Sequence, residues 1–299
     1  MREAAWTIDR IEDQAGRRVV ITGATSGIGK EAARVLAQKN AAVVIAARNM
    51  QKAQATVDEI RAAYPRADVT CRELDLSKLA SIKSFADAAM ADFDRLDVLI
   101  NNAGVMMCPY SKTEDGFENQ MGTNHLGHFA LTGRLMPLME KTPGSRVVVL
   151  SSIAHKSGNP DLSDLNWEQR KYKPMKAYGD SKLANLHFAY ELARRVKERG
   201  QNPIVTAAHL GWTATDLQRH SGTFSFLNPY FAQSIAMGTL PTLRAALDAN
   251  AGPGDYFGPN KLFETRGYPV KVTSNARSHD ASAAKALWEK SEALTGVRY

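Results

Sequence analysis

Tyr178 and Lys182 are the residues of this chain whose types and spacing most clearly suggest chemistry. At positions i and i+4 of a helix, two side chains lie on one face about one turn apart, so the lysine can hold its charge near the phenol. A phenol titrates near pH ~10, and a neighbouring cation lowers its pKa. The pair therefore predicts an acid–base group in which Lys182 adjusts Tyr178. The alternative is a packed tyrosine beside a solvated lysine.

A second pattern, near the N-terminus, predicts a nucleotide site. The apolar run 19–21 leads into Gly23, Gly27 and Gly29, and a helical pattern follows over 30–38. Glycine permits a tight turn and close approach of backbone to ligand, while a helix N-terminus offers unpaired N–H groups to a phosphate. The spacing is Gly-x-x-x-Gly-x-Gly rather than the general Gly-x-Gly-x-x-Gly. A plain strand-to-helix connection is the alternative.

Five motifs together resemble those of the short-chain dehydrogenase/reductase superfamily in order and approximate spacing. They are Thr22 to Gly29, Asn101-Asn102-Ala103-Gly104, Asn124, Ser151-Ser152 and Tyr178-x-x-x-Lys182. The resemblance covers about residues 17–204 and continues more weakly beyond. The segment 178–195 is most similar to the retinol-dehydrogenase-like and protochlorophyllide-reductase-like branches. Membership implies a Rossmann fold and hydride transfer with a nicotinamide cofactor.

The elements needed to position these residues follow from an alternating pattern along the chain. Six apolar runs predict buried strands separated by helices, at 19–21, 43–47, 69–74, 98–100, 147–150 and 204–208. This rhythm is typical of an α/β fold with a doubly wound parallel sheet flanked by helices. We expect one NAD(P)-binding Rossmann domain over 1–299, with an N-terminal extension (1–16), an insert before the catalytic helix (153–177) and a substrate-lid region (212–250).

The resemblance assigns a role to each residue of the catalytic group. Ser152, in preference to its neighbour Ser151, is expected to hydrogen-bond the substrate oxygen. Tyr178 would give a proton to that oxygen in reduction and remove it in oxidation. Lys182 would also hold the nicotinamide ribose, and Asn124 would position a water in a proton relay to Lys182.

The end of the second predicted strand indicates which cofactor is preferred. The chain reads Ala46-Ala47-Arg48-Asn49, whereas NAD-preferring members of the family carry an acidic residue there. Since no carboxylate repels a 2′-phosphate and the fork of Arg48 can bind one, NADP(H) is predicted over NAD(H). The alternative is that Arg48 points to solvent.

Further cofactor contacts are carried over from the family by position. The predicted set is Gly23, Thr25, Ser26, Gly27, Ile28, Gly29, Arg48, Asn49, Asp75, Leu76, Asn102, Ala103, Gly104, Tyr178, Lys182, Gly211, Thr213 and Thr215. Asp75 has an alternative role in helix capping near Ser77. Leu210 replaces the usual proline, which frees a backbone N–H and loosens φ in the cofactor loop.

The substrate is predicted only by class, as a hydrophobic alcohol or carbonyl compound. Aromatic and apolar residues between 212 and 238 predict either a lid over such a substrate or an anchor to the core: Phe224, Phe226, Leu227, Tyr230 and Phe231. A helix is predicted from about 231 to 250. The insert 153–177 either walls the pocket or obstructs a helix-packing surface used for tetramers, so a monomer or homodimer is expected.

Composition narrows the remaining classes. A net charge of +7 raises nucleic acid as a partner, but the basic residues are dispersed and do not alternate with aromatics, so none is expected. No run of 18 apolar residues or signal-peptide core is visible, which predicts a cytoplasmic protein with no membrane span. Two cysteines without ligand spacing, and the pair His125 and His128 without carboxylates, predict no metal site.

Two other functions use part of the same pattern. A non-catalytic dinucleotide-sensing regulator would need the Gly-rich turn, but it would not need the four catalytic residues together. A protochlorophyllide-reductase-like double-bond reductase would share Tyr178 and Lys182. That branch usually departs from Asn-Asn-Ala-Gly and from the serine, and both are present here.

Overall fold

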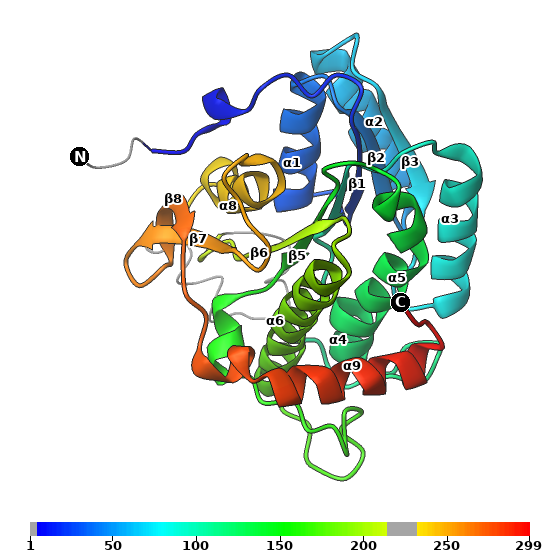
Figure 1. Cartoon of the computed structure of the whole chain (residues 1–299), viewed down its shortest axis with the longest axis vertical. Coiled ribbons are helices and arrows are strands. Elements are labelled where there is room, and N and C mark those ends of the chain that lie inside the picture. Colours follow the sequence, from blue (N-terminus) through cyan, green and yellow to red (C-terminus); the bar gives the residue numbers. More distant parts are fainter. Residues whose placement is uncertain (1–4, 214–231) are drawn as a thin grey trace.

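A computed structural model describes residues 5–213 and 232–299 of the chain (Figure 1). Within these ranges eight strands form one sheet in the order β3-β2-β1-β4-β5-β6-β7-β8. The strands are β1 Arg18–Thr22, β2 Ala42–Ala47, β3 Val69–Glu73, β4 Val98–Asn101, β5 Arg146–Leu150, β6 Ile204–Ala208, β7 Tyr256–Lys261 and β8 Arg266–Lys271. The order reverses direction between β1 and β4, as in a doubly wound fold.

The six predicted strands are confirmed, and they pair in parallel. Valine and isoleucine recur in the inner strands because a parallel sheet covered on both faces buries both sides of each strand, whereas β3, at the edge, has only Val69 fully buried. Val20, for example, lies beside Val44 on one side and Leu99 on the other. Two further strands, β7 and β8, were not predicted, because Pro259, Pro269 and nearby glycines are depleted in strands generally. β8 runs antiparallel to β7 at the sheet edge, so the sheet is mostly rather than wholly parallel.

Helices follow most of the strands. They are α1 Gly27–Gln38, α2 Met50–Ala63, α3 Leu79–Asp92, α4 Asn119–Met121, α5 Gly127–Glu140, α6 Pro174–Arg199, α8 Ile235–Leu247 and α9 Ala281–Thr295, with short turns η1 Ile8–Arg10, η2 Gly122–Leu126, η3 Ile153–Ser157 and η5 Ala276–His279. The helix expected over 231–250 is shorter, since the Ser234 hydroxyl caps α8 by accepting the Met237 N–H and Asp248 leaves the helix with extended backbone.

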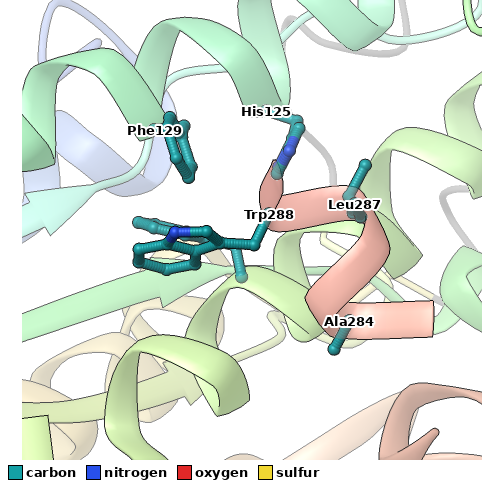
Figure 2. Close-up of a pocket in the computed structure, with 6 residues that line it drawn as sticks. His125, Phe129, Ala284, Leu287 and Trp288 are labelled. Carbon is teal, nitrogen blue, oxygen red and sulfur yellow. The ribbon is translucent and has the colours of Figure 1, made fainter. Parts of the chain in front are cut away.

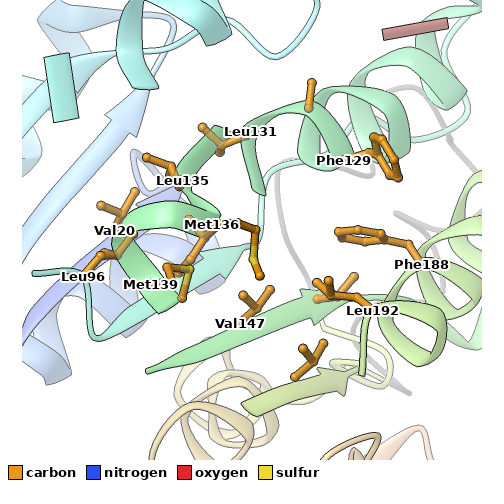
Figure 3. Close-up of a cluster of buried hydrophobic side chains, with 14 of the residues drawn as sticks. Val20, Leu96, Phe129, Leu131, Leu135, Met136, Met139, Val147, Phe188 and Leu192 are labelled. Atoms are coloured by element: carbon orange, nitrogen blue, oxygen red, sulfur yellow. The ribbon is translucent and has the colours of Figure 1, made fainter. Parts of the chain in front are cut away.

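The sheet carries a hydrophobic core on each face. On one face α3, α5 and α6 pack on the sheet, and Figure 3 shows Phe188 and Leu192 of α6 lying near Val147 of β5. On the other face α1, α2 and α8 cover Val19 and Ile21 of β1. Two covered faces are what a sheet of this kind requires, and they leave the strand ends as the open positions for a site.

The C-terminal helix α9 completes the first core. Figure 2 shows Trp288 close to Phe129 of α5, and their rings meet edge to face at 5.0 Å. His125 adds a hydrogen bond from this region, with its Nε2 2.9 Å from the Ser291 hydroxyl. The small hollow lined by these residues contains none of the predicted site residues. Among the described helices, none combines the length and the apolar character that crossing a bilayer requires.

The insert 153–177 is anchored to the segment around α4. The Tyr172 hydroxyl donates to Glu118 Oε1 at 2.9 Å and accepts from Gln120 Nε2 at 2.8 Å. Trp167 packs edge to face on Tyr172 at 5.5 Å. These contacts fix the insert beside the loop that follows β4, which is one of the predicted site segments.

Candidate active site

The segments predicted to form the site all follow the carboxyl ends of parallel strands. They come after β1, β2, β3, β4, β5 and β6, and the Tyr178 helix packs beside β5 and β6. In doubly wound sheets this edge forms the ligand crevice where the strand order reverses. Thr215 and the predicted lid residues 224–231 lie outside the described residues.

The Gly-rich turn after β1 needs its glycines for conformation and for space. Gly23 and Gly27 have φ of +68° and +54°, in the left-handed region that side chains disfavour. A Cβ on Gly23 would lie 2.8 Å from the Cβ of Ala103. One on Gly29 would lie 2.5 Å from Asn102 Nδ2 and 2.7 Å from the Gly23 carbonyl. The turn is therefore pressed against the segment after β4.

The N-terminus of α1 has the features of a phosphate site. Ser26 caps the helix with extended backbone, and its side chain makes no capping hydrogen bond to the described residues. The first intrahelical bond runs from the Lys30 N–H to the Ser26 carbonyl at 3.3 Å. A helix of 12 residues places N–H donors and a positive dipole end at this point. Thr25 and Ile28 flank it, so the predicted cofactor segment fits an anionic diphosphate.

Asn102 ties the Gly-rich turn to β4. Its Nδ2 donates to the Thr22 carbonyl at 2.8 Å and to the Gly23 carbonyl at 3.3 Å. The backbone N–H groups of Asn102 and Ala103 both donate to the Thr22 hydroxyl at 2.9 Å. The side-chain amide of this predicted cofactor residue is thus hydrogen-bonded to the turn itself. Its contribution in the structure is to shape the cofactor segment.

His128 extends this connection to the catalytic group, and sequence reasoning missed it. Its Nε2 lies 2.9 Å from the Thr22 hydroxyl and its Nδ1 lies 3.0 Å from the Asn124 carbonyl. Because a carbonyl only accepts, Nδ1 carries the proton and Nε2 accepts from Thr22. Burial lowers the pKa of His128 to about 4, so the ring is neutral at pH 7. Its position four residues after Asn124 was the available signal.

Asn124 lies in η2, a π-helical segment inside a longer run of helix. Its Oδ1 accepts from the Val105 N–H at 2.8 Å, and its Nδ2 donates to the Val105 carbonyl at 2.9 Å and to the Ser181 hydroxyl at 3.0 Å. Single π turns are often found at functional sites. The side chain joins the loop after β4 to α6, and a Cβ on Gly104 would come within 3.1 Å of its Oδ1.

Tyr178 and Lys182 lie in the first half of α6 and are both buried. Lys182 Nζ is 5.7 Å from the Tyr178 ring centroid and donates to the Leu150 carbonyl at 3.2 Å. Burial raises the pKa of Tyr178 to about 12 and lowers the pKa of Lys182 to about 8. In the chain alone, loss of hydration raises the pKa of Tyr178 and the opposing influence is Ser152, so the predicted adjustment of Tyr178 by Lys182 stays a prediction.

The two serines after β5 have different environments. Ser151 is buried and its hydroxyl donates to the Lys182 carbonyl at 2.8 Å. Ser152 is partly exposed, its hydroxyl accepts from the Ala154 N–H at 3.2 Å, and its side chain lowers the pKa of Tyr178 in opposition to burial. His155, a residue not singled out from the sequence, fixes this segment through its Nδ1, 2.6 Å from the Ser152 carbonyl. Ser151 is thus bonded to α6, and the choice of Ser152 as the catalytic serine stays a prediction.

The two residues after β2 have different environments: Arg48 is an unpaired cation among the described residues, and Asn49 is a helix cap. Arg48 is exposed and has no hydrogen bond or ion pair with any described residue. Asn49 Oδ1 accepts the Lys52 N–H at 2.9 Å and caps α2, so this predicted cofactor contact already has a structural role. The guanidinium of Arg48 remains available to an anionic group.

The residues after β3 mainly shape a turn. Asp75 Oδ1 accepts from the Ser77 N–H at 3.0 Å and from its hydroxyl at 2.6 Å. This is the local role weighed against cofactor binding, although α3 begins later, with Lys78 as its N-cap. Leu76 is buried, and its carbonyl lies so close to Gly127 that α5 has no room for a side chain there.

The loop after β6 is held although Leu210 replaces a proline. The Leu210 carbonyl accepts from the Thr213 hydroxyl at 2.8 Å and from Gln233 Nε2 at 2.9 Å. Gly211 has φ of +63°, and its N–H donates to His209 Nδ1 at 3.3 Å. The loosening expected from the loss of proline is therefore opposed by side-chain hydrogen bonds from Thr213, inside the predicted motif, and from Gln233, outside it.

Comparison with known proteins agrees with this arrangement. The family model described as short chain dehydrogenase matches residues 17–224. Retinol dehydrogenase 12 of Mus musculus is 42% identical over 95% of this chain and 88% of its own length. Retinol dehydrogenase 13 of Homo sapiens is 40% identical over 94% of this chain and 85% of its own length.

Solved structures share the fold. A crystal structure of an uncharacterized protein from Mycobacterium Paratuberculosis has a TM-score of 0.84 and 42% identity, covering 99% of both chains. A short chain dehydrogenase from Shigella flexneri complexed with NADP has a TM-score of 0.66 and 24% identity, covering 83% of this chain and 98% of its own. The chain belongs to the short-chain dehydrogenase/reductase family, in its retinol-dehydrogenase-like branch.

Proposed function

We propose that this oxidoreductase uses NADP(H) to interconvert a hydrophobic alcohol and the corresponding aldehyde or ketone, with Tyr178 as the general acid and base. The observation that carries the proposal is the meeting of three groups at one strand end. The Ser152 side chain lowers the pKa of the buried Tyr178 phenol in opposition to burial, and Lys182 lies one helical turn away on the same face of α6.

The acid–base properties of the pair suit reduction at neutral pH. With a pKa of about 12, Tyr178 holds its proton and can donate it to a carbonyl oxygen. With a pKa of about 8, Lys182 is mostly charged at pH 7 and stabilises the phenolate that this donation leaves. Ser152 would hydrogen-bond the same substrate oxygen. In the oxidative direction the Tyr178 phenolate would remove the alcohol proton. The bound NADP(H) would supply or accept the hydride.

Two segments support the choice of NADP(H). The N-terminus of α1 offers N–H donors to the diphosphate, and Arg48 lies at the end of β2 where a 2′-phosphate would be recognised. A guanidinium binds phosphate through parallel N–H groups, and the exposed Arg48 has no carboxylate beside it in sequence to compete. The Gly-rich turn, Lys182 and Thr213 would complete the cofactor contacts.

The substrate class rests on the relatives. Two of them, at 42% and 40% identity over most of this chain, are named retinol dehydrogenases, and retinol is a large apolar alcohol. We propose a bulky apolar alcohol or aldehyde for this chain as well.

Removing the Tyr178 hydroxyl tests the proposed role of this residue as the general acid. Tyr178→Phe keeps the packing of the ring and should lower kcat by roughly 10²–10⁴, the usual contribution of a positioned acid. NADPH affinity, measured by fluorescence titration, should stay within about twofold. Tyr190→Phe is the matched control, because Tyr190 lies on the same helix and its hydroxyl bonds only the distant Ser274 among the described residues. Turnover close to wild type in Tyr178→Phe would remove the basis of the proposal.

A further inference from the structure

The turn that joins β7 to β8 has unusual backbone conformation. Leu262, Phe263 and Glu264 have φ of +48°, +55° and +65°, three consecutive residues with side chains in the left-handed region. Each such residue is disfavoured by a close approach of Cβ to the backbone. Conformations of this kind persist only where surrounding contacts hold them, and they gather at functional sites.

The contacts of this turn lead to the loop after β6. The carbonyl of Thr265 accepts the Trp212 N–H at 2.7 Å. Gly211 lies directly against the same carbonyl, leaving no space for a Cβ. Glu264 Oε2 lies 3.2 Å from His209 Nε2. The turn therefore contacts the loop 209–213 at His209, Gly211 and Trp212.

His209 is oriented for this contact from both sides. The Gly211 N–H donates to its Nδ1 at 3.3 Å, so Nδ1 is the acceptor and Nε2 carries the proton that faces Glu264. The ring is fully buried, and it lies over Gly258 of β7 so closely that any Cβ there would collide with Nε2. Glycine at 258 thus provides the space for the ring.

Glu264 also reaches the segment that follows Ser152. Its Oε2 lies 3.6 Å from Nζ of Lys156, in the turn η3 that begins directly after Ser152. One carboxylate therefore joins the serine segment to the loop that carries Gly211 and Thr213.

We propose that Glu264 is a positioning residue for the proposed oxidoreductase site, which acts through His209 to hold the loop 209–213 in the shape that receives the cofactor. The inference rests on the proposed function only for the identity of that cofactor. Leu210 lacks the ring that would fix φ at this point. The contacts of Glu264, Thr265 and Gln233 supply the restraint instead. The strained conformation of the turn has a purpose in this proposal, because it directs the Glu264 side chain toward His209.

Amide hydrogen exchange of the cofactor-free protein tests the restraint directly. Glu264→Ala should accelerate exchange of the Gly211 and Trp212 amides roughly tenfold, because it removes the carboxylate that contacts the buried His209 ring. Phe263→Ala is the matched control, since Phe263 lies on the same strained turn, is 93% exposed and should leave exchange unchanged. Equal exchange in Glu264→Ala and wild type, or equal acceleration in both variants, would overturn the proposal.

Glu264→Gln separates the contact with His209 from general weakening of the turn. Its amide oxygen can take the place of Glu264 Oε2 beside His209 Nε2, so exchange should stay within about threefold of wild type. Behaviour identical to Glu264→Ala would overturn the role assigned to His209.

Cofactor titration gives the second readout. Glu264→Ala should raise the NADPH dissociation constant and KM for NADPH roughly tenfold, with kcat changed less than threefold, because the loop is repositioned on binding. A large fall in kcat at unchanged NADPH affinity would contradict a positioning role. The exchange measurement requires no ligand, so it decides the role of Glu264 even if wild type turns over no carbonyl compound.

Discussion

The two sides of the crevice are held in different ways. On the β1–β4 side, Thr22, Asn102 and His128 form a buried network whose members belong to short motifs or lie one helical turn from one. On the β6 side, the loop 209–213 is held by Gln233 and by the β7–β8 turn, which lie far along the chain. The first side is rigid through close packing, and the second depends on long-range contacts to a strained, partly exposed turn.

This difference predicts that a glycine-to-alanine substitution lowers the unfolding free energy more on the β1–β4 side than on the β6 side. Gly29→Ala should cost about 3 kcal/mol of unfolding free energy, because its Cβ would meet the Gly23 carbonyl at 2.7 Å and the Ala24 Cα at 2.9 Å, and backbone cannot move aside cheaply. NADPH binding should weaken in parallel. Urea denaturation and fluorescence titration measure the two effects.

Gly258→Ala and Gly252→Ala complete the comparison. Gly258→Ala displaces the His209 side chain, so it should cost less, about 1–2 kcal/mol, while loosening the loop 209–213. A Cβ on Gly252 meets nothing closer than 3.8 Å and should be nearly neutral. If Gly258→Ala were the most damaging of the three, the β1–β4 side would not be the more rigid one.

The next largest expected effect is a loss of unfolding free energy in acid, through His128 on the β1–β4 side. The folded-state pKa of His128, about 4, lies below its ordinary 6.5, so the unfolded chain binds more protons and stability falls as pH drops below about 6.5. His128 alone should remove about 2 kcal/mol between pH 7 and pH 5. Urea midpoints at the two pH values measure this loss, and His128→Gln should reduce it.

His209 provides the matched test on the other side. Burial also lowers the pKa of His209, but Glu264 opposes that shift by favouring the charged ring. His209→Gln should therefore reduce the acid sensitivity less than His128→Gln does. An equal reduction would mean that the carboxylate does not stabilise the ring in solution.

The smallest of these effects concerns cofactor choice. Arg48→Ala should raise the NADPH dissociation constant about tenfold, or about 1.4 kcal/mol, and leave that for NADH unchanged, because only NADPH carries the 2′-phosphate. Lys52→Ala, on an exposed position of the adjacent helix, is the control. An unchanged NADPH constant in Arg48→Ala would mean that the guanidinium points to solvent in the complex.

The same contrast explains what could be predicted from the sequence. Short apolar runs rich in valine and isoleucine predicted β1 to β6, with β3 the weakest of them, and the motifs at their ends predicted the catalytic group. The strands β7 and β8 were not predicted because proline, present at 259 and 269, is unusual in strands. A sheet edge, as at Pro269, or a bulge, as next to Pro259, tolerates it. The burial that raises the pKa of Tyr178 depends on packing, which residue spacing does not report.

The residues that support the predicted site also differ in whether the sequence could have revealed them. His128 could have been found, since it lies one helical turn after Asn124. The pairing of His209 with Glu264 had no local signal, because it arises only when β7 lies beside β6 and the turn folds back.

The central claim is the reaction, and NADPH consumption at 340 nm tests it most directly. Wild-type protein should be assayed at pH 7 against aldehydes and ketones from small aliphatic to bulky aromatic, terpenoid and retinoid compounds, with NADH in parallel. The account predicts turnover with NADPH that rises with the size and apolar character of the substrate. Tight NADPH binding with no turnover across the panel would contradict it and would favour a dinucleotide-sensing role.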